Sequence, residues 1–140
     1  MKVSDLPFNR YLGIEPAQDA AEAGVALHVE SHHLNHIETI HATVLFGIAE
    51  AASGHCLLQR FPGLLTSHVA VLRTSSVKYR RPGMPHDRIQ AAGKIDTEAE
   101  ARFSEELSDR GRATIDVTVA VSQNNTELLT GTFGWFVSAQ

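Results

Sequence analysis

Residues 40–59, IHATVLFGIAEAASGHCLLQ, form a long apolar segment in which Glu50 is the only residue with a full charge at neutral pH. Such a segment predicts a buried helix around which the rest of the chain folds. Alanine and leucine, which favour helix, recur throughout it, and Phe61-Pro62-Gly63 provides a stop signal. We take Thr39 as the N-cap. Apolar residues occupy the whole circumference of the predicted helix, so we expect protein to enclose it on most sides.

Strands on both sides of this helix are predicted from the alternation of apolar and polar residues. The alternating segments are residues 24–30, 68–81, 88–95, 113–121 and 128–137, and the turn Gln123-Asn124-Asn125-Thr126 joins the last two into a hairpin. In the second segment the alternation puts one set of side chains on a common face, namely Val69, Val71, Ser75, Val77 and Tyr79.

A short amphipathic helix is predicted between two of the strands. Thr97-Glu98-Ala99-Glu100 fits a capping box, Phe103 and Leu107 continue the apolar spacing of four, and Gly111 closes the helix. The order is therefore one strand, one long buried helix, and four strands with a helical insertion. This order predicts an α+β fold, in which one antiparallel sheet curls around one central helix, and a single domain over residues 1–140.

Composition narrows the class of protein further. With 140 residues, 43% of them hydrophobic, the chain has room for one core. Its 16 acidic and 12 basic residues give a net charge of -4, which argues against nucleic-acid binding. One cysteine, Cys56, cannot form an internal disulfide, and the chain lacks the apolar run of a signal peptide or a membrane span. We therefore expect a cytoplasmic protein that does not enter a membrane.

Glu50 requires an explanation, because a carboxylate on an apolar helix loses much of its hydration. One interpretation is that it faces a gap at the sheet edge or forms an ion pair with Arg73 or Arg80. The other is that Glu50 is a general base or nucleophile whose pKa is raised by its surroundings. Composition alone leaves both interpretations open.

The start of the helix offers a second chemical group. Its first four backbone N–H groups have no partner within the helix, and with the helix dipole behind them they suit a developing oxyanion. Asn35 precedes the start and His41-Ala42-Thr43 stands at it. Ala42 and Glu50 are about 12 Å apart along a regular helix, and His41 and Glu50 point to opposite faces. A shared reaction therefore requires Glu50 from one subunit and the Asn35/Ala42 end from its partner in a two-fold dimer.

The order and spacing of Asn35, His41 and Glu50, within NHIETIHATVLFGIAEAASG, resemble a known signature. It is the N-x5-H-G-G-x6-D/E pattern of hotdog-fold acyl-CoA thioesterases of the phenylacetate-degradation type, and the strand order agrees over about 120 residues. The resemblance implies a hotdog fold, with a curved antiparallel sheet around one long helix. It also implies a homodimer with one continuous sheet, often paired again into a homotetramer.

The same resemblance implies roles for individual residues. Glu50 corresponds to the carboxylate that activates water or attacks the thioester, Asn35 to the residue that orients the water or substrate, and the Ala42 N–H to the donor that polarises the thioester oxygen. His41 shapes the pocket or hydrogen-bonds the Asn35 loop. The chain departs from the signature where Ala42 and Thr43 replace the paired glycines. The backbone donor survives this change, whereas the side chains narrow the approach of a thioester.

A basic cluster has two interpretations, a solvated strand end or a contact with the phosphates of coenzyme A. Its members lie within nine residues, namely Arg73, Lys78, Arg80 and Arg81. Thr74 and Ser76 add hydroxyl groups to the candidate substrate site, although a slip of one residue reverses which strand face looks inward.

Five of the eight histidines fall between His28 and His41, but they lack the spacing of a zinc motif. We therefore expect no metal and no cofactor. The leading hypothesis is an enzyme that hydrolyses acyl-CoA or a related thioester. The alternatives are a non-catalytic hotdog module that binds an acyl thioester or merely assembles, and a hotdog hydratase or dehydratase, for which His41 with Glu50 across the dimer is the best available pair.

Overall fold

The computed structural model describes residues 1–18 and 24–140. Its helices and strands, in chain order, are α1 (Pro7–Leu12), β1 (Glu15–Pro16), β2 (Gly24–His28), α2 (Ala42–Arg60), β3 (His68–Tyr79), β4 (Arg88–Lys94), α3 (Thr97–Arg110), β5 (Arg112–Gln123) and β6 (Thr126–Ala139). Short 3-10 turns lie at Val3–Asp5, Ser31–His33 and Leu64–Thr66. The sequence prediction did not include α1 and β1, which precede the first predicted strand.

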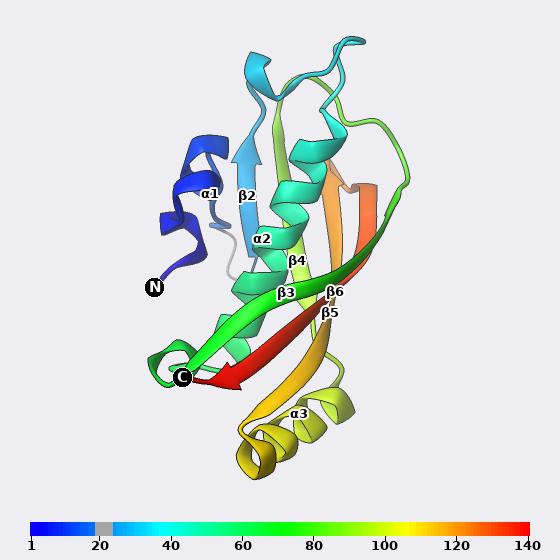
Figure 1. The fold of residues 1–140 in the computed structure, drawn as a ribbon. Coiled ribbons are helices and arrows are strands. Elements are labelled where there is room, and N and C mark those ends of the chain that lie inside the picture. The colour runs from blue at the N-terminus through cyan, green and yellow to red at the C-terminus, as the bar shows by residue number, and fades with distance from the viewer. Residues whose placement is uncertain (19–23) are drawn as a thin grey trace.

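The strands form an antiparallel sheet in the order β1-β2-β4-β5-β6-β3, which curves around α2 (Figure 1). The predicted α+β architecture, a curled sheet around one long helix, is confirmed, and this is the hotdog fold. Strand β3 lies at one edge of the sheet, with β6 as its neighbour on the inner side. No helix among the described residues is long and apolar enough to cross a membrane.

The core lies between α2 and the inner face of the sheet. Leu45, Ile48 and Ala52 of α2 are fully or almost fully buried against residues such as Leu27 and Ile89 of the sheet. A leucine or isoleucine side chain contributes about 1.5 to 3 kcal/mol when it leaves water completely. A second cluster forms where Phe103 of α3, which is 1% exposed, packs against the beginning of β5. Burial therefore fixes α2 along the middle of the sheet.

Both predicted helix starts are wrong by one or two residues. Helix α2 begins at Ala42, and His41, not Thr39, is its N-cap. Thr39 instead belongs to the preceding turn, where its backbone N–H donates to the Asn35 side chain and its hydroxyl accepts from the Asn35 amide. Helix α3 is capped by the Asp96 side chain, which accepts from the Ala99 N–H, so the predicted capping box starting at Thr97 is absent from this helix. Gly111 ends α3 in the left-handed conformation, as predicted.

The predicted common face of β3 is wrong because the strand contains a β-bulge. The register with β6 shifts between Leu72 and Thr74, so Arg73 is an extra residue. Leu72 and Val77 therefore both pack toward the core, although they are five residues apart, whereas Val69 and Val71 point outward. An inserted residue reverses the alternation of every side chain that follows it.

Candidate active site

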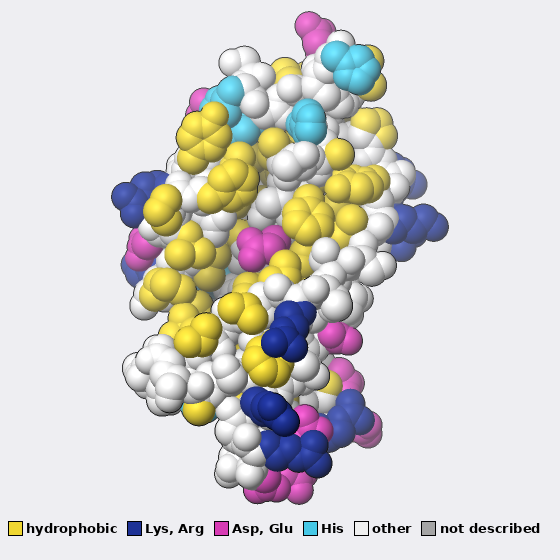
Figure 2. Space-filling view, viewed as in Figure 1, with side chains coloured by type: hydrophobic (Ala, Val, Ile, Leu, Met, Phe, Trp, Pro, Cys, Tyr) yellow, Lys and Arg dark blue, Asp and Glu magenta, His cyan; other side chains and the backbone are white. Residues whose placement is uncertain are grey.

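Glu50 lies half-buried in the middle of α2. Helical spacing puts Phe46, Gly47 and Gly54 on the same face. Phe46 packs on Phe133 of β6, and Gly47 lies so close to α1 that an added Cβ would sit 2.9 Å from Leu12. Figure 2 shows this side of the molecule, where hydrophobic side chains gather over α1, α2 and β3 with an acidic side chain among them. Glu50 thus lies in an apolar setting between α1 and β6.

The Glu50 carboxyl has an altered acidity. Burial raises the pKa of Glu50, and no hydrogen bond or neighbouring charge from the described residues opposes the effect. The ion-pair interpretation from the sequence is wrong for both candidate partners. Arg73 lies 3.7 Å over the ring of Phe136, and the Arg80 Nε lies 3.4 Å from the Glu127 carboxylate. Glu50 is therefore a half-buried carboxyl group without a partner among the residues that the structure describes.

The start of α2 leaves one backbone donor free. The Thr43 N–H donates to Nδ1 of His41 at 3.0 Å, and the N–H groups of Val44 and Leu45 donate to the His41 carbonyl. Only the Ala42 N–H, of the first four in the helix, has no acceptor within the described part of the chain. Ala42 and Thr43 are exposed. Because His41 accepts from the Thr43, Val44 and Leu45 N–H groups, the Ala42 N–H is the donor at the helix start that can bind a ligand.

Asn35 holds the turn that leads into α2. Its side-chain oxygen accepts from the N–H groups of Ile37 and Thr39, both at 3.1 Å, and its amide donates to the Thr39 hydroxyl at 2.8 Å. The turn contains Glu38 in the left-handed region, with φ of 59°. Both acceptor positions of the Asn35 oxygen are occupied, so one amide hydrogen is what remains for a ligand.

His33 is a residue whose importance the sequence did not reveal. Its ring is 1% exposed, Nδ1 accepts from the Glu30 N–H, and Nε2 lies 3.0 Å from the Leu12 carbonyl. A backbone N–H on Nδ1 requires the proton on Nε2, so the ring is neutral and donates to Leu12. Burial and the neighbouring His32 lower the pKa of His33. His33 therefore ties the loop before α2 to the end of α1; its position in a histidine-rich run gave no signal of this.

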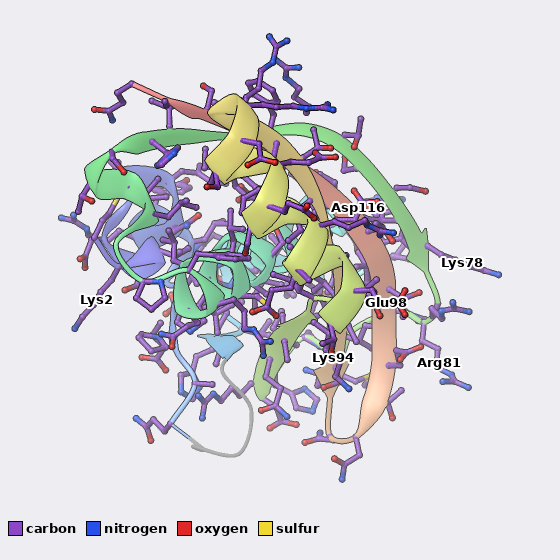
Figure 3. The ribbon with its side chains drawn as sticks, turned by 90° about the horizontal axis from the view of Figure 1, so that it is seen from below. Lys2, Lys78, Arg81, Lys94, Glu98 and Asp116 are labelled. Atoms are coloured by element: carbon purple, nitrogen blue, oxygen red, sulfur yellow. The ribbon has the colours of Figure 1, made fainter. Side chains whose placement is uncertain are left out.

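The basic residues of β3 lie away from Glu50. Ser76 and Lys78 line a depression of about 830 Å³ on the outer face of the sheet, together with Thr118, Thr130 and Lys94. Thr74 lies on the same outer face, over Gly134 of β6. In Figure 3, Lys78 and Arg81 project outward at the end of β3. Within one chain the fold does not bring Thr74, Ser76 or Lys78 to the face of α2 that carries Glu50.

The histidines do not form a metal centre in the described part of the chain. No group of three or more histidine, cysteine, aspartate or glutamate side chains there is arranged to hold a metal ion. His41 is engaged in capping and His33 in the loop contact. Cys56 is buried, and burial raises the pKa of its thiol, which disfavours the reactive thiolate.

The arrangement separates its two chemical groups. Ala42 is the first residue of α2 and Glu50 lies eight residues later, so about 12 Å of helix lies between them. A thioester carbonyl carbon and its oxygen are bonded to each other, so one substrate molecule cannot contact both groups at bonding distance within one chain. A single chain thus supplies one half of a possible acyl-transfer site at each of two places.

The family described as Domain of unknown function (DUF4442) matches residues 13–137. The chain belongs to this family. The match covers the Asn35 turn, all of α2 and nearly all of the sheet, so this DUF4442 domain contains both halves of the candidate site. A comparison with curated proteins finds no match.

Solved structures share the fold of this DUF4442 domain. A protein of unknown function from Pseudomonas aeruginosa, described as a probable thioesterase, superposes with a TM-score of 0.80 at 16% identity, over 99% of this chain and 91% of its own. A mutant of the phenylacetic acid degradation protein PaaI from Thermus thermophilus has a TM-score of 0.71 at 26% identity, over 94% and 98%. A Bacillus halodurans protein with CoA has a TM-score of 0.63 at 20% identity, over 81% and 66%. The chain is thus similar to hotdog proteins of the thioesterase type.

Proposed function

We propose that this protein hydrolyses acyl-CoA or a closely related thioester at the interface of a homodimer. Glu50 of one subunit acts as general base toward water, or attacks the carbonyl carbon itself. The Ala42 N–H of the other subunit donates to the thioester oxygen as negative charge develops on it. As a base, Glu50 takes a proton from water, the hydroxide adds to the carbonyl carbon, the carbon–sulfur bond breaks, and the proton passes to the departing thiolate of coenzyme A. As a nucleophile, Glu50 forms an acyl anhydride as the carbon–sulfur bond breaks, and water then hydrolyses this anhydride. Both routes release the thiol and a carboxylic acid and restore Glu50.

The observation that carries this proposal is the state of the Glu50 carboxyl. It is half-buried on an apolar face, its pKa is raised, and it lacks a partner among the described residues. A carboxyl group that only stabilised the fold would be paired or fully solvated, because burial without a partner costs free energy. A raised pKa also improves a carboxylate as a base near neutral pH.

The free donor at Ala42 supports the same chemistry. His41 satisfies the Thr43 N–H, so it keeps α2 capped while the Ala42 N–H stays available. Asn35 shapes the turn before the helix and keeps one amide hydrogen for the substrate or water. The Thr43 hydroxyl, on the same helix face as Glu50, borders the approach of the thioester.

The dimer in this proposal forms through the edge of β3. This strand has twelve residues and pairs with β6 on one side only, among the described residues. Edge strands of this length readily pair with another chain. Pairing two copies of β3 about a two-fold axis gives a continuous sheet and two equivalent sites, each with Glu50 from one copy and Ala42 from the other.

Cations at the end of β3 are proposed to bind the phosphates of coenzyme A. Lys78 and Arg81 are exposed and form no ion pair within the described residues. Arg80 is less available, because it donates to Thr130 and lies beside Glu127. We propose that the hydroxyls of Thr74 and Ser76, on the outer face of the same strand, contact the part of the substrate beyond the reacting carbonyl.

The replacement Glu50→Gln tests the function. Release of free thiol from a panel of aryl, short-chain and long-chain acyl-CoA thioesters is measured for the parent, for Glu50→Gln, and for Glu105→Gln as an exposed control on α3. We expect the parent to release thiol from at least one thioester, Glu50→Gln to lose about 10² to 10⁴ in kcat, and Glu105→Gln to match the parent.

The same experiment separates the non-catalytic alternative. A hotdog module that only binds acyl thioesters would release no thiol in the parent and would still bind acyl-CoA in equilibrium dialysis. The occupied oxygen of Asn35 favours this alternative, because that oxygen is not free to orient water in the single chain. Thiol release that survives Glu50→Gln at the parent rate contradicts the proposed role of Glu50.

A further inference from the structure

A buried hydroxyl lies one helical turn after Glu50. Ser53 is 0% exposed, and its hydroxyl donates to the backbone carbonyl of Glu50 at 2.7 Å. The indole N–H of Trp135, on β6, donates to the same hydroxyl oxygen at 3.1 Å. A chain of two hydrogen bonds thus connects strand β6 with the turn of α2 that carries Glu50.

The direction of this chain is fixed by chemistry. An indole N–H can only donate, so the Ser53 oxygen must accept from Trp135 and turn its own hydrogen toward an acceptor. The Glu50 carbonyl is that acceptor. A serine bonded in this way to the preceding turn alters the local geometry of a helix, so the bond acts on the backbone at Glu50.

The residue next to Ser53 makes room for the indole. Gly54 has no side chain, and a Cβ built there would lie 3.4 Å from Cζ2 of Trp135. The ring therefore rests against the backbone of α2, one turn beyond Glu50. Strand β6 lies between β5 and β3, so Trp135 is carried by a strand that is paired on both sides.

We propose that Ser53 and Trp135 are positioning residues, which hold the Glu50 turn of α2 at a fixed distance from the sheet and so aim its carboxylate at the reacting carbonyl. This inference rests on the proposed thioesterase function. Neither residue touches the substrate. The rate of acyl transfer depends steeply on the placement of the attacking group, whereas substrate affinity is set by the acyl and CoA contacts. Loss of the chain of hydrogen bonds therefore lowers kcat and leaves KM.

The variants Ser53→Ala, Trp135→Phe and their double combination test the proposal. Ser53→Ala removes both hydrogen bonds of the chain, and Trp135→Phe removes only the one from the indole N–H. Both changes keep most of the apolar volume. Ser104→Ala is the matched control, because the Ser104 hydroxyl also donates to a helix carbonyl, that of Glu100 at 3.0 Å, but in the exposed helix α3. Thiol release gives kcat and KM, and thermal unfolding shows which variants are folded.

We expect each single change to lower kcat about tenfold with KM within about twofold, and the control to match the parent. The double variant is expected to be no slower than the slower single variant, because both changes break the same chain. If Trp135→Phe does not fold, benzothienylalanine at this position replaces the indole N–H by sulfur with almost the same shape. An unchanged kcat in folded variants, or a double variant with the product of both losses, overturns the proposal.

If the proposed thioesterase function is wrong, the parent protein itself releases no thiol, which distinguishes this outcome from failure of the positioning role. In that case the carboxyl carbon of Glu50 is followed by NMR titration in the same variants. Positioning predicts that Ser53→Ala and Trp135→Phe let Glu50 move toward water, which lowers its pKa, while Ser104→Ala does not. An unmoved titration of Glu50 in both folded variants overturns the positioning role independently of any activity.

Discussion

The Glu50 carboxyl and the Ala42 N–H are both without a hydrogen-bond partner among the described residues, because of the residues around them. Burial makes the carboxylate of Glu50 harder to form, and the capping of Thr43 by His41 leaves the Ala42 N–H without an acceptor in the described part of the chain. A carboxylate and a free N–H are the two groups that hydrolysis of a thioester needs, one to drive the attack and one to stabilise the oxyanion.

The pH dependence of the reaction is predicted from the raised pKa of Glu50. Only the ionised carboxylate acts as a base, so kcat/KM rises with pH, with a midpoint above the ordinary glutamate value of about 4.3. A pH profile of thiol release over the folded range measures this midpoint. An acid limb at or below the ordinary value contradicts a buried Glu50 as the base.

The raised pKa of Glu50 also makes the stability of the fold depend on pH. Stability falls as pH rises, whereas kcat/KM increases. Because the folded pKa of Glu50 is above the unfolded one, the folded state binds more protons between these values. The stabilising contribution is complete below the unfolded pKa and is lost as pH rises through the folded pKa. Urea unfolding is therefore expected to show the parent losing stability relative to Glu50→Gln over this range. A constant difference between the two proteins argues against the raised pKa.

At the scale of elements, the bulge in β3 decides which side chains face the core. Val77 and Leu72 pack inward on either side of Arg73, whereas Val69 is 44% exposed. We expect Val77→Asp to lower the free energy of unfolding by about 2 kcal/mol or more, because it buries part of a charge without a partner. Val69→Asp is expected to change it by less than about 0.5 kcal/mol.

Chemical denaturation of both variants under monomeric conditions measures this difference. The simple alternation of the sequence puts Val69 and Val77 on one face and predicts equal effects. Equal losses in the two variants would therefore contradict the bulge at Arg73.

Much of the element pattern was predictable from residues whose signals are local. The apolar circumference of α2, the alternation of β5 and the closing Gly111 all indicated the observed elements. The resemblance of the Asn35, His41 and Glu50 spacing to a known thioesterase signature implied the hotdog fold, which the structure has. Local sequence patterns did not predict the N-cap of α2 or the inward face of β3, because contacts with other residues or an inserted residue determine them. Thr39 does not cap α2 because it belongs to the preceding turn, where its backbone N–H and its hydroxyl both bond to the Asn35 side chain, and one extra residue at position 73 changes the face of every later side chain in β3.

The candidate site was predictable only in part, for the same reason. Glu50 is conspicuous in the sequence because its helix is otherwise apolar. The Ser53 and Trp135 contact joins residues 82 positions apart, and the His33 contact with Leu12 joins residues 21 positions apart. Neither pair has a spacing that a sequence pattern reports, since the curvature of the sheet and the path of the loop create both contacts.

In the whole molecule, a complete site requires a second copy of the chain. The fold holds Glu50 and Ala42 about 12 Å apart on one helix and leaves β3 at the edge of the sheet. A two-fold dimer through that edge would complete the site twice. Each reaction is therefore proposed to use Glu50 from one chain and the Ala42 N–H from the other.

Complementation between two inactive variants tests this claim most directly. Glu50→Gln removes the base. Ala42→Pro removes only the free N–H, since proline is tolerated at the first position of a helix and His41 already has the extended backbone that precedes proline, with φ of -62° and ψ of 137°. Each variant alone is expected to lose most of its thiol release. The two are then unfolded, mixed in equal amounts and refolded together.

Random pairing makes about half of the dimers mixed, and each mixed dimer has one intact site, so the account predicts recovery of about a quarter of the parent activity. A mixture that stays at the level of the separate variants, although mixed dimers are present by mass spectrometry, would contradict a site shared between two chains.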